Sequence, residues 1–161
     1  MKKIIFSILF LFCGLFIFSQ EFNIQWLINM SDYISKPTRQ IPDDFIQQPS
    51  DKNTFLREWS NNVKEEIFIG NNVIIGVSWM REFSARSILS SEYDRFFEFL
   101  IIRFGNPLES TESSSIWDWN ARPLVFGTDD IILGVALTLP SYIGLTQDQW
   151  DQYVEFIKLM E

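Results

Sequence analysis

The single cysteine of the chain, Cys13, lies inside an apolar N-terminal run, so the rest of the chain has to fold without a disulfide. Of the 161 residues, 47% are hydrophobic and 16% are aromatic. A chain of this length suits one domain with its own core, and its apolar content excludes a disordered chain. We therefore expect a fold that is stabilised by the packing of large aromatic side chains.

The first 19 residues have the order of an export signal. Lys2 and Lys3 precede an apolar stretch at 4–18, and Ser19 follows it. The stretch is about 15 residues long, shorter than the ~20 that a membrane-spanning helix needs. We predict a cleaved signal peptide and an exported protein, periplasmic, secreted or held in the cell envelope. Two alternatives remain: a lipoprotein acylated at Cys13, and an uncleaved N-terminal anchor, the only membrane attachment that we expect.

The charge balance argues against several classes of partner. Lysine and arginine total 13 and aspartate and glutamate total 21, which gives a formal net charge of −8. Binding to a polyanion requires clustered basic residues, whereas the arginines here are spread among acids. We predict no nucleic-acid partner and no electrostatic attraction to anionic lipid.

The absence of histidine excludes much catalytic chemistry. A Ser-His-Asp triad, a Cys-His pair and a histidine-ligated zinc or haem site are impossible without it. The chain also lacks a glycine-rich phosphate loop and a calcium loop of the EF-hand type. We predict no catalytic residue, no metal ion and no cofactor, and a protein that is not an enzyme. Carboxylates alone can still cleave glycans, so that chemistry stays open.

The best helical pattern lies at 91–104, where apolar residues recur with a spacing of three and four. Gly105 and Pro107 then favour an end of the helix. Phe99 and Ile102 fall on the other side of this helix. They predict either a helix covered on two sides or an apolar spot that faces outward and binds a partner.

Three further helices are expected. The last begins at a capping box formed by Thr146 and Gln149. Another is expected at 21–34, where the run lacks glycine and proline, and a short one at 51–60, capped by Asp51.

Strand patterns predict two hairpins. One joins 64–69 to 73–80 through a Gly-Asn-Asn turn, and the other joins 116–126 to 131–139. The predicted fold is α+β, with an antiparallel sheet of about four strands and two to four helices packed mainly on one face.

The predicted organisation has three parts. The signal peptide spans 1–19, an N-terminal helix and a proline-containing segment span 20–50, and a single globular α+β domain spans 51–161. Three prolines between 37 and 49 prevent a continuous helix or a central strand in the second part.

The most distinctive cluster is Trp117-Asp118-Trp119. Both indoles lie on one side of the expected strand, and stacked indoles beside a carboxylate can bind a sugar. Two tryptophans spaced i, i+2 are, however, more typical of a core. We interpret the chain as a small, acidic, exported binding or envelope-associated domain whose partner is a protein or a glycan. The alternative is a carbohydrate-binding or carboxylate-only glycan-cleaving protein.

Overall fold

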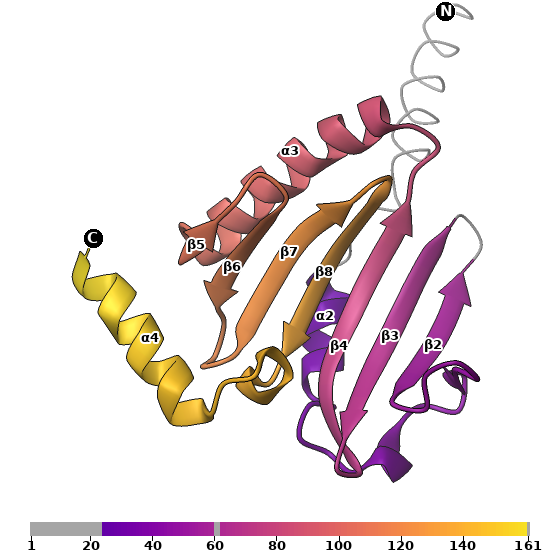
Figure 1. Ribbon diagram of the computed structural model, residues 1–161. Helices are drawn as coiled ribbons and strands as arrows, with labels where there is room; N and C mark the ends of the chain where they lie inside the picture. The colour runs from indigo at the N-terminus through magenta and orange to yellow at the C-terminus, as the bar shows by residue number, and fades with distance from the viewer. Residues whose placement is uncertain (1–23, 60–61, 161) are drawn as a thin grey trace, which may run out of the picture.

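The computed structural model describes residues 24–59 and 62–160. The predicted signal peptide and Cys13 lie outside these residues. Eight strands form one sheet in the order β1-β2-β3-β4-β8-β7-β6-β5, and every neighbouring pair is antiparallel (Figure 1).

The elements have the following bounds. The strands are β1 (Ile46–Gln47), β2 (Thr54–Trp59), β3 (Val63–Gly70), β4 (Val73–Glu82), β5 (Glu109–Ser110), β6 (Ser114–Asp118), β7 (Pro123–Asp129) and β8 (Ile132–Thr138). The helices are α2 (Ile24–Ser31), α3 (Arg86–Phe104) and α4 (Gln147–Met160), with the short 3-10 helices η1 (Thr38–Gln40) and η2 (Pro140–Ile143).

The prediction of about four strands in two hairpins, with the helices mainly on one face, is therefore wrong. The expected helix at 51–60 is strand β2, because tertiary pairing with β3 overrides the weak helical spacing. Asp51 does not cap a helix there; it accepts hydrogen bonds from the Thr54 hydroxyl and the Asn53 N–H in the turn before β2.

The expected strand at 116–126 is two strands, β6 and β7. The chain turns between them at Asn120 and Ala121, which both have positive φ. Pro123 can follow this turn because it is the first residue of β7. The two-residue edge strands β1 and β5 complete the count of eight.

The sheet is built from two similar halves. In each half a helix, α2 or α3, is followed by a two-residue edge strand and then by three longer strands. The last strands of the halves, β4 and β8, pair at the centre of the sheet. In each half the chain therefore enters the sheet at one of its two edges, with β1 or β5, and proceeds strand by strand to the centre.

Helices α2 and α3 pack on one face of the sheet, which we name the covered face. α2 contributes Leu27 and Met30 to the core, and α3 contributes Phe96 and Leu100. The strands contribute alternate residues, among them Ile67, Val77, Trp79, Leu124, Phe126, Val135 and Leu137. Phe45 of the proline-containing segment belongs to the same core, so residues 24–50 pack with the rest of the chain.

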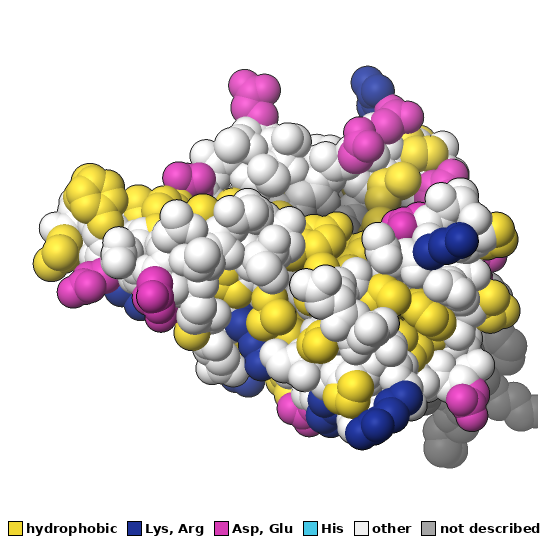
Figure 2. Space-filling model, turned by 60° about the horizontal axis from the view of Figure 1, so that its bottom comes forward, with side chains coloured by type: hydrophobic (Ala, Val, Ile, Leu, Met, Phe, Trp, Pro, Cys, Tyr) yellow, Lys and Arg dark blue, Asp and Glu magenta, His cyan; other side chains and the backbone are white. Residues whose placement is uncertain are grey.

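The opposite face, which we name the open face, is covered only in part. Asp118, at the end of β6, contacts Trp150 and Lys158 of α4, and Tyr142 of η2 packs on Phe68 of β3. α4 projects at one side of the molecule as an arm that carries hydrophobic side chains (Figures 1 and 2). Within 24–59 and 62–160, no helix combines the length and the apolar character needed to cross a bilayer.

Candidate ligand-binding hollow on the open face

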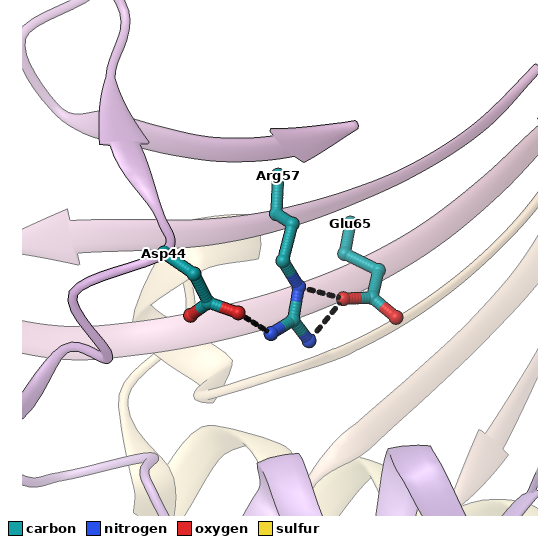
Figure 3. Close-up of polar contacts among 3 residues, drawn as sticks. All are labelled: Asp44, Arg57 and Glu65. Atoms are coloured by element: carbon teal, nitrogen blue, oxygen red, sulfur yellow. Dashed lines mark hydrogen bonds and ion pairs between the residues drawn. The ribbon is translucent and has the colours of Figure 1, made fainter. Parts of the chain in front are cut away.

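Two adjacent glutamates of β3 point to opposite faces of the sheet, because side chains alternate along a strand. Glu65 lies on the covered face and is only 4% exposed. The Arg57 Nε group donates a hydrogen bond of 2.6 Å to Glu65 Oε2, and a second guanidinium nitrogen contacts the same carboxylate. The third nitrogen bonds Asp44, so all sides of the guanidinium are engaged (Figure 3).

Aromatic rings complete the surroundings of Arg57. Its guanidinium carbon lies 4.4 Å from the centre of the Phe45 ring and 4.9 Å from that of Trp59. Burial acts to lower the pKa of Arg57, but the bonds to Asp44 and Glu65 outweigh it and raise the pKa. This group is a structural clamp that fixes the proline-containing segment to strands β2 and β3.

Glu66 lies on the open face and has much weaker partners. Its carboxylate accepts a hydrogen bond of 3.3 Å from the Ser78 hydroxyl and one of 3.4 Å from the Gln48 amide. Both donors are neutral, and both bonds are long. Lys64 on the same face forms an ion pair with Glu58, at 3.6 Å between Nζ and Oε1. Burial raises the pKa of Glu66.

Glu66 lines a hollow of about 300 Å³ on the open face. The residues around the hollow come from β2, β3, β4, β8 and the segments beside them: Gln48, Leu56, Asn62, Lys64, Glu66, Met80, Glu82 and Ile132. Small residues of β4 and β8, Ser78 and Ala136, face each other next to Glu66 in the sheet.

Tyr142 lies close to Glu66. Its ring centre is 4.9 Å from that of Phe68. Burial, with the charges of Glu66 and Asp51 nearby, raises the pKa of Tyr142. The phenol is thus a neutral hydrogen-bonding group near the hollow.

The structure does not bring the tryptophan cluster together as one platform. Trp117 is 1% exposed, and its Nε1 donates a hydrogen bond of 2.9 Å to the Gly105 carbonyl. Trp119 is half-buried against Phe104, with ring centres 5.6 Å apart. Asp118 points to the open face, where it accepts a hydrogen bond of 3.1 Å from Trp150 Nε1.

The structure does place Phe99 and Ile102 together on the outer side of α3. Phe99 is 39% exposed and Ile102 is 83% exposed. Since α3 packs on the covered face, this apolar spot and the hollow lie on different sides of the molecule.

The sequence interpretation took Glu66 for a solvated acid without a role and did not identify its neighbours in the hollow. The signal was present, because Glu66 alternates with the buried Ile67 and Glu65 along β3. What the sequence could not show was that β2, β4 and β8 bring Leu56, Met80 and Ile132 around it.

Within the described residues, no group of three His, Cys, Asp or Glu side chains could hold a metal ion. Comparison of the chain with protein-family models, with curated proteins and with solved structures gives no match. Function is therefore inferred from the geometry of the hollow.

Proposed function

We propose that the chain is a non-enzymatic binding protein of the cell envelope or the extracellular space, and that the hollow on the open face receives a cationic group of its ligand. One observation carries the proposal: the half-buried Glu66 carboxylate has only long hydrogen bonds to neutral donors. A carboxylate in such a place gains from a charged donor, because charge-assisted hydrogen bonds are shorter and stronger than neutral ones.

On the covered face, the neighbouring carboxylate of β3 has a charged hydrogen-bond donor. Glu65 receives a guanidinium that is also flanked by aromatic rings. On the open face, Glu66 supplies the matching acid, and no arginine lines the hollow. An ammonium or guanidinium of a ligand would take the place that Arg57 takes beside Glu65.

The walls of the hollow suit a cation on an apolar stem. Leu56, Met80 and Ile132 offer apolar contact, and Glu82 supplies a second carboxylate. A volume of about 300 Å³ is at the small end for ligand pockets. The size matches one side chain of a lysine or arginine type, so we take the ligand to be a basic peptide segment.

The carbohydrate alternative gains no support from a specific contact. Trp117 lies in the core, and Asp118 already accepts a hydrogen bond from Trp150. A sugar platform built on these residues would need the core to open.

The test is a titration followed by amide chemical shifts. Acetyl-lysine-methylamide is the probe, and acetyl-norleucine-methylamide, which has the same stem length without the charge, is the matched probe. We expect the lysine probe to shift amides of β3 and β4 around Glu66 and Ser78, and the norleucine probe to leave them unchanged. Equal shifts from both probes would contradict the proposal.

Two variants separate a site from general attraction by an acidic protein. Glu66→Gln should weaken binding of the lysine probe by about tenfold or more, the loss of one charged hydrogen bond. Glu112→Gln removes the same charge from an exposed turn between β5 and β6 and should leave binding unchanged. Equal weakening by both variants would show non-specific attraction and would overturn the proposal.

A further inference from the structure

The hollow on the open face contains a positive charge of its own. Among the described residues that line it, Lys64 is the one basic residue. Its side chain is 45% exposed, and its Nζ lies 3.6 Å from Oε1 of Glu58. An ammonium that belongs to the chain would compete with a cation of the ligand for Glu66. The position of Lys64 therefore decides whether the hollow is free.

Lys64 lies within reach of two acids of the open face. Glu58 is its direct partner across the β2–β3 pair, and side chains directly opposite each other are about 5 Å apart at Cβ. Glu66 is two residues further along β3, on the same face and about 7 Å away between Cα atoms. The flexible four-carbon stem of a lysine spans either distance. The same ammonium can thus pair with Glu58 or with Glu66.

In the structure the ammonium of Lys64 is paired with Glu58. The ion pairs of the described residues do not include Glu66, whose hydrogen bonds come from Ser78 and Gln48. The charge of Lys64 acts to lower the pKa of Glu66, but burial outweighs it and raises the pKa. Lys64 is therefore near enough to influence Glu66 without occupying the place beside it.

We propose that Glu58 is a positioning residue: it pairs with Lys64, keeps that ammonium away from Glu66 and so leaves the hollow open to a cation of the ligand. The inference rests on the function proposed above, because it concerns the same carboxylate. An ion pair between side chains that are 45% and 61% exposed contributes little to stability. Loss of Glu58 should therefore shift the position of Lys64 by a few-fold and not by orders of magnitude.

The first experiment repeats the titration with acetyl-lysine-methylamide on variants of Glu58. Glu58→Gln frees Lys64 to pair with Glu66 and should weaken binding of the probe about threefold. Glu58→Asp keeps the charge and should retain most of the affinity. Glu112→Gln, which removes the same charge from the exposed turn between β5 and β6, is the matched control and should bind like the parent.

Removal of Lys64 distinguishes positioning from a simple loss of negative charge. In a Lys64→Met background no ammonium is left to move, so Glu58→Gln should change the affinity by much less than it does in the parent. An equal weakening with and without Lys64 would overturn the proposal. Unchanged binding by Glu58→Gln in the parent background would overturn it as well.

A second measurement needs no ligand. The pKa of Glu66, followed through the carbon-13 shift of its carboxylate, should fall in Glu58→Gln because Lys64 moves towards it. It should fall by less in the Lys64→Met background, and an equal fall in both would overturn the proposal. The other charged or titratable groups near Glu66 are unchanged in all these proteins: Asp51, Glu82 and Tyr142.

The two measurements separate this inference from the proposed function. A parent protein that does not bind the lysine probe would overturn the proposed function, and the titration of Glu66 would still show whether Glu58 positions Lys64. If Glu66→Gln weakens binding and Glu58→Gln does not, the proposed function stands and the positioning role of Glu58 is wrong.

Discussion

The two faces of the sheet surround adjacent glutamates of β3 with different partners. On the covered face, Glu65 is buried and bound by Arg57, which also binds Asp44 and contacts two rings. On the open face, the next residue, Glu66, has two long hydrogen bonds to neutral groups. One residue along the strand separates a structural acid from the acid that we propose binds a ligand.

The degree of burial and the hydrogen-bonding partners that the fold supplies decide the role of each acid. A buried charge is tolerated only with a full set of partners, because desolvation costs several kcal/mol per ion. A half-buried charge keeps part of its hydration, so the fold tolerates it without a charged partner.

The largest effect is expected from the aromatic core of the covered face. Phe126 packs against Tyr93, at 5.0 Å between ring centres, and against Phe96, at 6.4 Å. Phe126→Ala should lower the free energy of unfolding by about 4 kcal/mol, through lost burial and a cavity. Urea denaturation measures it. Met80→Ala on the open face is the control and should cost only about 1 kcal/mol. Equal losses would show that the open face is packed like a core.

The next effect concerns the clamp. Arg57→Met should lower the free energy of unfolding by about 3 kcal/mol, because it leaves the buried Glu65 carboxylate without its cation. The double variant Arg57→Met/Glu65→Leu should be more stable than Arg57→Met alone, since no charge is then left unpaired. A thermodynamic cycle from urea denaturation gives the coupling. If the two changes simply add, Glu65 is not held by Arg57.

Helix ends and one hairpin could be predicted because their signals are local. The capping box is confirmed: the Gln149 N–H donates to the Thr146 hydroxyl at 3.2 Å, and the Thr146 N–H donates to the Gln149 side chain at 2.8 Å. The hairpin over 64–80 is confirmed as β3 and β4, with Asn71 and Asn72 at positive φ in the turn. The helix at 91–104 is confirmed as part of α3, which begins earlier, at Arg86.

The sheet could not be predicted because its extent depends on distant pairing. Strand β2 exists through its partner β3, and the apolar residues Phe55, Leu56 and Trp59 fit a helical spacing equally well in isolation. Residues 116–126 are also ambiguous, because an internal proline does not show whether a strand resumes or turns back.

The candidate hollow could not be predicted for the same reason. Its walls come from β2, β3, β4 and β8, and residues 56 and 132 are far apart in the sequence. Alternation along β3 shows that Glu65 and Glu66 face different ways. Only the tertiary structure shows which of the two has an arginine.

A smaller effect is expected on the outer side of α3. Phe99→Asp should cost about 1 kcal/mol in the free energy of unfolding, because Phe99 is partly exposed and the new charge can reach water. The matched variant Leu100→Asp places the same charge on the covered face and should abolish cooperative unfolding. Thermal denaturation distinguishes them. Loss of cooperativity in Phe99→Asp itself would place this residue in the core.

The smallest effect is a pH dependence set by Glu66. Burial raises the pKa of Glu66 above its ordinary value of 4.5, so between that value and the raised pKa the folded chain holds the proton more tightly than the unfolded chain does. The contribution of Glu66 to stability is therefore lost as the pH rises through this window. Glu66→Gln should match the parent below pH 4.5 and be more stable than the parent at pH 7.

Urea denaturation of both proteins at several pH values measures this difference. Glu112→Gln, in the exposed turn between β5 and β6, is the control and should show no such gain. A gain for Glu66→Gln that grows as the pH falls would mean that Glu66 is stabilised as an anion, by Lys64 or another cation of the chain. A saturating lysine probe should remove the gain at pH 7, because a bound ammonium would give Glu66 a charged hydrogen-bond donor such as Glu65 has in Arg57.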